Sequence, residues 1–132
     1  MINDGPPNSF AGKTLHKLAP SENCVTISVA LPQPGGTRTL IGTLGAFSKD
    51  DPPGTCEIGY SILPSFEGQG FATEGTLALI DYLRRNTSTN SIIAHTFPSL
   101  PRSIRVMEKC GLVLDGDGEE AGTIRYRLNL RS

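Results

Sequence analysis

A short stretch near the middle of the chain constrains the fold most. A strand-like run over 55–62 leads into the glycine-rich turn Glu67-Gly-Gln-Gly-Phe-Ala-Thr-Glu74, and apolar residues at helical spacing then cover 72–85. A second strand-like and mostly apolar run follows over 91–97. A helix that crosses over between two neighbouring strands leaves those strands parallel in one sheet. The sequence therefore predicts a βαβ unit at the centre of the fold.

Further strands are predicted on both sides of this unit, with a second helix after it. Alternating polar and apolar residues, β-branched residues and breaks rich in glycine or proline mark these elements. They are strands over 24–31 and 39–47, a helix over about 100–110, and a terminal hairpin made of 112–114 and 124–130. Together they predict an α+β fold with a mixed, mostly antiparallel sheet.

The length and composition fit one folded domain over residues 1–132, with 37% hydrophobic and 19% charged residues. Residues 1–22 are rich in Pro, Gly, Ser and Asn, so we predict an irregular N-terminal segment there. The net charge of −1 provides no broad basic field, so nucleic acid is not an expected partner. No apolar run approaches the roughly 20 residues that span a bilayer, so a membrane is not expected either.

The compartment and the absence of a metal site are also predicted. The chain has three cysteines without a close-spaced motif, and its N-terminus lacks the basic and apolar regions of a secretory signal. Both features predict reduced thiols in a cytoplasmic protein. The acidic segment Asp115-Gly-Asp-Gly-Glu-Glu120 lacks the full ligand spacing of a calcium loop, so we expect a polar hairpin loop there.

The glycine-rich turn is a candidate phosphate-binding site. Gly68 and Gly70 allow backbone amides to turn inward where the following helix begins. Free N–H groups and the helix dipole at such a terminus favour an anionic ligand. Considered alone, the same pattern also fits a tight strand–helix turn that binds nothing.

Four segments in order resemble the GNAT superfamily of N-acetyltransferases, most closely its RimJ/RimL-like branch. The resemblance covers residues 24–130 approximately. The matching segments are Glu57-Ile-Gly-Tyr60, Gly68-Gln-Gly-Phe-Ala-Thr-Glu74, Ala94-His-Thr96 with Pro98, and Ser103-Ile-Arg-Val-Met-Glu-Lys-Cys-Gly-Leu112. A lone Gly-x-Gly would be weak evidence, whereas four ordered segments with matching predicted structure indicate the fold.

The resemblance implies acyl-coenzyme A, here acetyl-CoA, as the cofactor. It also implies transfer of the acetyl group to an amine acceptor, either a small molecule or a protein N-terminus. In the family the pantetheine arm pairs with strand backbone, which implies Ile62 and Leu63 here. The pyrophosphate is held by loop amides, which implies Gly68, Gln69, Gly70, Phe71, Ala72 and Thr73.

The resemblance also points to two catalytic candidates. Glu57 is the candidate general base, and a solvated or salt-bridged strand residue is the alternative. Ser103 is the candidate donor to the departing thiolate, and ordinary capping in the first turn of the helix is the alternative. His95 titrates near neutral pH, but we expect a satisfied core histidine there.

The sequence departs from the family at the acceptor side. Relatives usually have a strand and two helices before the strand that 24–31 matches, and we expect these to be missing or reduced here. Glu67 replaces the Arg or Gln that begins the general coenzyme A signature, and Leu100 replaces a common Asn. A scaffold repurposed for another reaction in small-molecule biosynthesis, or for binding without acetyl-CoA, is therefore the alternative function. Strand edges exposed by the short N-terminal region make a homodimer possible.

Overall fold

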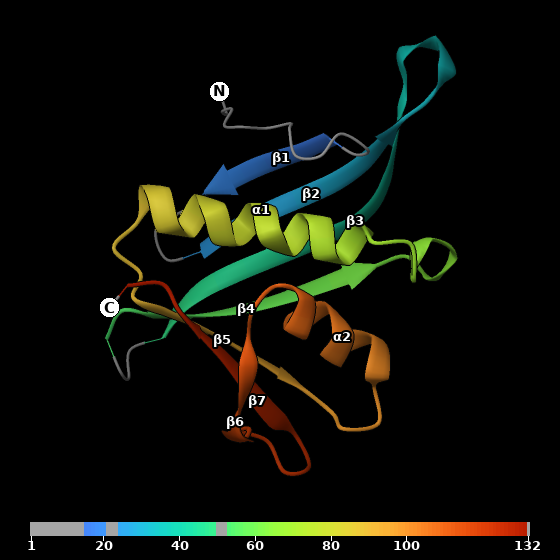
Figure 1. Ribbon diagram of the computed structural model, residues 1–132. Coiled ribbons are helices and arrows are strands. Elements are labelled where there is room, and N and C mark those ends of the chain that lie inside the picture. The colour runs from blue at the N-terminus through green and yellow to red at the C-terminus, as the bar shows by residue number, and fades with distance from the viewer. Residues whose placement is uncertain (1–14, 21–23, 50–52, 132) are drawn as a thin grey trace.

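The computed structural model describes residues 15–20, 24–49 and 53–131. They form one seven-stranded sheet with the strand order β1-β2-β3-β4-β5-β7-β6 and two α-helices (Figure 1). The strands are β1 (Leu15–Pro20), β2 (Cys24–Pro32), β3 (Arg38–Lys49), β4 (Thr55–Ile62), β5 (Ser91–Thr96), β6 (Val113–Asp117) and β7 (Ile124–Asn129). The helices are α1 (Phe71–Asn86) and α2 (Pro101–Lys109), and short 3-10 turns cover Pro34–Gly36 and Pro64–Phe66.

The central βαβ unit is confirmed. Strands β4 and β5 are parallel, and α1 connects them through the glycine-rich turn. Their pairing is short, since it joins only Thr55 with Ser91, Cys56 with Ile92 and Glu57 with Ile93. Beyond Glu57 the two strands diverge, as Figure 1 shows. All other neighbouring strands are antiparallel, so the predicted mixed sheet is also confirmed.

Both helices cover the same face of the sheet. Helix α1 contacts β2, β3 and β4, and α2 contacts β5 and α1. The predicted apolar stripe of α1 is buried at Thr76, Leu79, Ile80 and Leu83, because these positions recur at helical spacing. Gly75 brings α1 close to β3, since a Cβ built there would lie 2.8 Å from a methyl carbon of Leu44.

The prediction for the N-terminal segment is wrong at residues 15–20, which form β1. This strand pairs antiparallel with β2 from Leu15 opposite Ala30 to Pro20 opposite Val25. The backbone edge of β2 would otherwise lack hydrogen-bond partners, and β1 supplies them despite its weak sequence pattern. A six-residue strand is therefore present on the N-terminal side of β2, where we expected a strand and two helices to be missing or reduced. Only residues 21–23 separate it from β2, so no pair of helices fits between them.

Strand β3 is irregular near Gly42. The β2–β3 register shifts between Val29 and Ala30, which pair with Gly42 and Leu40. A Cβ at Gly42 would lie 2.6 Å from the Ser61 carbonyl oxygen, so the close approach of β4 requires glycine there.

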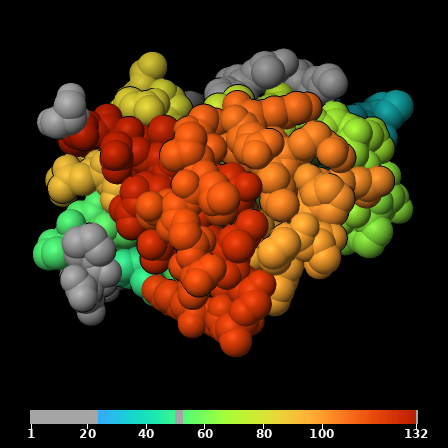
Figure 2. Space-filling view, turned by 60° about the horizontal axis from the view of Figure 1, so that its bottom comes forward, coloured from blue at the N-terminus to red at the C-terminus, as the bar shows by residue number. Residues whose placement is uncertain are grey.

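The C-terminal third of the chain makes up much of one face (Figure 2). In that view the orange surface of α2 and β6 adjoins the red surface of β7 and, on the right, the green surface of the residues around β4. Neither described helix is long and apolar enough to cross a bilayer.

Candidate functional site

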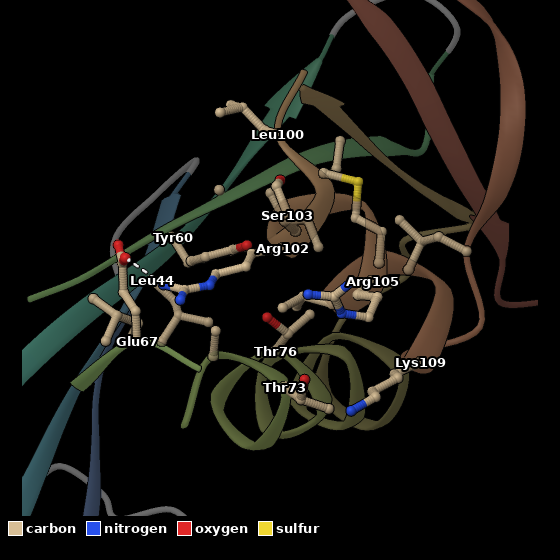
Figure 3. Close-up of a pocket in the computed structure, with 18 of the residues that line it drawn as sticks. Leu44, Tyr60, Glu67, Thr73, Thr76, Leu100, Arg102, Ser103, Arg105 and Lys109 are labelled. Carbon is tan, nitrogen blue, oxygen red and sulfur yellow. Dashed lines mark hydrogen bonds and ion pairs between the residues drawn. The ribbon is translucent and has the colours of Figure 1, made fainter. Parts of the chain in front are cut away.

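A cavity of about 670 Å³ opens between the two helices, where β4 and β5 diverge (Figure 3). Its walls come from the glycine-rich turn, the first two turns of α1, the end of β4, and one side of α2. Of the predicted cofactor-binding residues, Ile62, Gly68, Gly70, Ala72 and Thr73 line it. The βαβ topology therefore brings the strand residue Ile62 together with four residues of the glycine-rich turn.

The glycine-rich turn has a backbone that only glycine adopts easily. Gly68 and Gly70 have φ of 77° and 90°, and Gly70 is the N-cap residue of α1. Gly70 makes no side-chain capping bond, because it has no side chain. In the described part of the chain, the amides from Gly68 to Thr73 donate to no backbone acceptor. These N–H groups at the start of a 16-residue helix favour an anion.

Two predicted loop residues have other positions. The Gln69 side-chain amide donates to the Ser65 carbonyl at 3.2 Å, which holds the turn together. The Phe71 ring is buried and packs against Phe66 at a centroid distance of 6.2 Å. Only the backbone amides of these two residues are therefore candidates for ligand binding.

Basic side chains face the turn from α2. Arg102, Arg105 and Lys109 line the cavity at helical spacing and extend towards the space above α1 in Figure 3. Arg102 Nη1 lies 3.2 Å from Glu67 Oε1, so the carboxylate that departs from the coenzyme A signature is paired. Arg102 also borders Gly68, where an added Cβ would lie 3.7 Å from the guanidinium carbon.

The backbone of β4 conflicts with the predicted role of Leu63. Its N–H donates to the Ile41 carbonyl at 2.8 Å, and its carbonyl accepts from the Phe66 N–H at 2.8 Å. Successive residues of a strand direct their backbone groups to opposite neighbours. Ile62 points its groups the other way, as does Tyr60 two residues earlier, towards the side where β5 has diverged. Tyr60 and Ile62 are therefore better placed than Leu63 for an added extended ligand.

Two hydroxyl groups lie together deeper in the cavity. Ser103 and Tyr60 both line it and approach each other in Figure 3. Burial raises the pKa of Tyr60, and a hydrogen bond with Ser103 opposes this rise. The phenol therefore stays protonated at neutral pH and can donate. The predicted Ser103 lies in the cavity wall, in the first turn of α2, whose N-cap residue is Leu100.

Thr76 also contributes a polar atom to this cavity. The residue is 3% exposed and lines the wall on α1. Among the described residues, its Oγ1 has no hydrogen-bond partner. Buried hydroxyl groups are nearly always bonded, so this atom is suited to a polar group of a ligand.

Glu57 lies on the opposite face of the sheet from the helices and does not line the cavity. Its Oε2 is 2.9 Å from Nδ1 of His95, and its Oε1 is 3.4 Å from Nζ of Lys49. Hydrogen bonds with Glu119 and Glu57 raise the pKa of Lys49. His95 does line the cavity, so it connects the two faces where the strands part.

The expectation of a satisfied core histidine is only half correct. Nδ1 of His95 is bonded to Glu57, whereas its Nε2 is buried and has no partner among the described residues. In the acidic segment, Asp115 binds Arg127 at 2.9 Å and Arg125 at 3.1 Å. The described residues contain no group of three or more His, Cys, Asp or Glu that could hold a metal ion.

The family model described as "Acetyltransferase (GNAT) domain" matches residues 8–113. The chain belongs to the GNAT acetyltransferase family. This match covers more than half of the chain and includes the glycine-rich turn, both helices and the first five strands. The resemblance seen in the sequence is thereby confirmed.

Similar GNAT proteins include a curated bacterial relative and two solved structures. The uncharacterized N-acetyltransferase p20 of Bacillus licheniformis is 34% identical over 80 residues, which are 61% of this chain and 45% of that protein. This chain thus spans less than half the length of that relative. The ribosomal-protein-S5-alanine acetyltransferase from Vibrio fischeri has a TM-score of 0.70 at 19% identity, covering 80% of this chain and 61% of the other.

The spermidine N-acetyltransferase from Vibrio cholerae, solved with CoA and spermine, has a TM-score of 0.69 at 20% identity. That match covers 83% of this chain and 67% of the other. At these identities the structures show the GNAT fold alone.

Sequence reasoning missed three contributors to the site. Thr76 falls within the helical pattern over 72–85 and Tyr60 within the strand pattern over 55–62, and neither pattern marks a polar role. The basic residues of α2 show helical spacing from Arg102 to Lys109, but the sequence does not show which way that side of the helix faces. The pairing of Arg102 with Glu67 spans 35 residues, so only the fold reveals it.

Proposed function

We propose that this GNAT domain transfers an acetyl group from acetyl-CoA to an amine. The observation that supports this proposal most is the cavity itself. One wall has helix N-terminal amides that donate to no backbone acceptor in the described part of the chain, and another has three cationic side chains. Coenzyme A is a long polyanion with an extended amide-containing arm. The cavity offers anion-binding groups at its mouth and unpaired strand backbone farther in.

The residues fit the cofactor at its phosphates. Gly70 has open space within 4 Å of where a Cβ would lie, so the loop leaves room for a ligand against its backbone. Three cations line the cavity against one carboxylate, Glu67, which is paired with Arg102. The negative charge at position 67 is therefore compensated across the turn, and it does not argue against a phosphate there.

The chain's own groups have distinct roles in this proposal. Acetyl-CoA would supply an activated acetyl group as a thioester. Tyr60 and Ile62 would hold the arm through backbone groups, and the paired hydroxyls of Tyr60 and Ser103 would donate hydrogen bonds near the sulfur. Proton removal from the acceptor falls to the carboxylate–imidazole pair of Glu57 and His95.

The acceptor in this proposal is a primary amine on a small molecule or a peptide. It would approach the face of the sheet that neither described helix covers, where Glu57 and Glu119 flank Lys49. The names of two similar solved structures indicate spermidine and an alanine of ribosomal protein S5 as substrates of those proteins. Spermidine and a peptide with an N-terminal alanine are therefore suitable first probes.

Calorimetric titration with acetyl-CoA tests the cofactor part. We expect micromolar binding to the wild type and loss of binding in Gly70→Glu, because the new carboxylate would lie against the phosphate-binding amides. Gly35→Glu is the matched control. Gly35 has a φ of 88° and open space around it, so this variant adds the same strain and charge far from the cavity.

Two results would count against the proposal. The first is a folded wild type that binds no acetyl-CoA, which would favour the repurposed scaffold. The second is equal loss of binding in Gly70→Glu and Gly35→Glu, which would point to general strain as the cause. If binding is confirmed, release of free thiol in the presence of spermidine or the alanine peptide then tests transfer.

A further inference from the structure

We propose that His95 is the group that takes the proton from the acceptor amine, and that Glu57 is its positioning residue. This inference rests on the proposed acetyl transfer and reassigns the base that the sequence suggested. It begins from the two bonds of Glu57. Both of its carboxylate oxygens are engaged, one by His95 at 2.9 Å and one by Lys49 at 3.4 Å.

A carboxylate held in this way is a poor proton acceptor for a third group. Lys49 and His95 each engage one of its oxygens, so a proton on either oxygen would compete with one of these two partners. Glu57 also lies outside the cavity lining, whereas His95 is part of it. Of the two bonded residues, only His95 therefore also lines the cavity.

The hydrogen bond to Glu57 fixes the form of the imidazole. A carboxylate only accepts, so Nδ1 of His95 carries the proton and the lone pair lies on Nε2. This Nε2 is buried without a partner among the described residues. An acceptor nitrogen left in this state is unfavourable unless a donor reaches it, and an ammonium group is such a donor.

The hairpin between β6 and β7 closes over one edge of the ring. A Cβ at Gly118 would lie 2.6 Å from Cδ2 of His95, so only glycine allows this approach. The Gly118 N–H donates to the Thr123 carbonyl at 2.9 Å and therefore does not occupy the ring nitrogen. The hairpin thus covers the Cδ2 edge of the imidazole and leaves Nε2 without a bond from the described residues.

Other charged groups around the pair are already bonded. Glu119 lies on the far side of Lys49, at 3.3 Å. Arg125, opposite His95 on β7, is bonded to Asp115 at 3.1 Å. Glu57 is therefore the carboxylate that stabilises a positive charge on the ring.

The proton balance of the step is complete. The acceptor ammonium gives one proton to Nε2 of His95, and the neutral amine forms its bond to the acetyl carbon as the carbon–sulfur bond breaks. A second proton from the nitrogen passes to the sulfur, which leaves as the free thiol. His95 then returns its proton to water.

The test compares His95→Asn with Glu57→Gln in the full chain. An Asn amide can still donate to Glu57 but cannot take up a proton, so the first variant keeps the pair and removes the base. We expect kcat to fall about 10²- to 10⁴-fold in His95→Asn, with the acid limb of its pH profile lost. In Glu57→Gln the limb should remain and move to lower pH, because a neutral amide stabilises the imidazolium less.

A second readout does not depend on turnover. Nitrogen-15 NMR of the histidine rings should show the Nδ1–H form for one of the two histidines, His16 and His95, in the wild type. That signal should vanish in His95→Asn and shift towards a tautomer mixture in Glu57→Gln. Calorimetry with acetyl-CoA should give affinities within about twofold of the wild type for both variants.

The outcomes separate this inference from the proposed function. Wild type that binds no acetyl-CoA overturns both. A second outcome overturns only the role of His95. In it, the wild type binds acetyl-CoA and acetylates spermidine or the alanine peptide, and His95→Asn keeps its turnover within threefold and keeps the acid limb. Loss of that limb in Glu57→Gln instead would return the role of base to Glu57.

Discussion

Replacement of Thr76 by Val should raise stability and weaken cofactor binding at the same time. The two side chains have nearly the same shape, and their helix propensities are similar. The substitution therefore removes mainly the hydroxyl, whose oxygen is buried without a partner among the described residues. An unsatisfied buried polar group costs about 1–3 kcal/mol. We expect Thr76→Val to be about 1–2 kcal/mol more stable, which for a chain of this size raises Tm by about 3–10 °C.

The expected effect on binding has the opposite sign. If the hydroxyl bonds a polar group of acetyl-CoA, its loss removes a net contribution of about 0.5–1.5 kcal/mol. That corresponds to affinity about 2- to 13-fold weaker. Thr76→Ser keeps the hydroxyl, so its affinity should stay near that of the wild type. Thermal unfolding of the protein without ligand and calorimetric titration measure the two effects separately.

Thr89→Val is the matched control for stability. Thr89 is also buried, but its Oγ1 lies 3.3 Å from Sγ of Cys56 and 2.8 Å from Oγ1 of Thr87. Removing a bonded hydroxyl leaves its partners unsatisfied, so this variant should be less stable by about 1–2 kcal/mol. A similar loss of stability in Thr76→Val would refute the reasoning, since it would show that the Thr76 hydroxyl has a partner. A gain in stability with unchanged affinity would exclude a contact with the cofactor.

Three further predictions concern the basic wall, a buried thiol and the sheet edge. Arg102→Met should bind acetyl-CoA at least fivefold more weakly, and its Tm should change little because the exposed ion pair of Arg102 contributes under about 1 kcal/mol. Arg85→Met breaks a similar exposed pair with Asp81 and should leave binding unchanged. Burial raises the pKa of Cys110 to about 11, so its alkylation by iodoacetamide should be slow at pH 8 and accelerate only as the pH rises towards 11. Mass spectrometry measures the extent of alkylation, and fast labelling at pH 8 would contradict this prediction. The outer strand β6 exposes Val113 and Leu114, so we expect a homodimer that Val113→Lys weakens in size-exclusion chromatography; a concentration-independent monomer would remove this expectation.

The elements with strong local patterns were predictable. Strand β4 begins and ends as expected, and α1 differs by one residue at each end, because its apolar spacing and its flanking turn agree. Strand β1 was not predictable, because its residues show no clear alternation of polar and apolar side chains and its stability depends on pairing with β2. A preference for strand can be read from the sequence only where the residues themselves favour a strand, and not where pairing with a neighbouring strand decides it.

Site residues divide in the same way. The glycines at 68 and 70 were identified because a positive φ at a helix start is a property of the local chain. The position of Leu63 was misjudged, because the direction of a backbone N–H depends on which neighbouring strand takes it. The bond between Glu57 and His95 joins residues 38 apart, and no spacing in the sequence indicates it.

The sequence by itself determined the βαβ unit, the glycine-rich turn at the start of α1 and the resemblance to the GNAT family. These are matters of local periodicity, backbone freedom and ordered motifs. Only the tertiary structure decided that β4 and β5 separate after three residue pairs, that α2 brings its cations to the turn, and that His95 connects Glu57 to the cavity. Each depends on how distant segments pack, and packing directions are set by the whole sheet and its core.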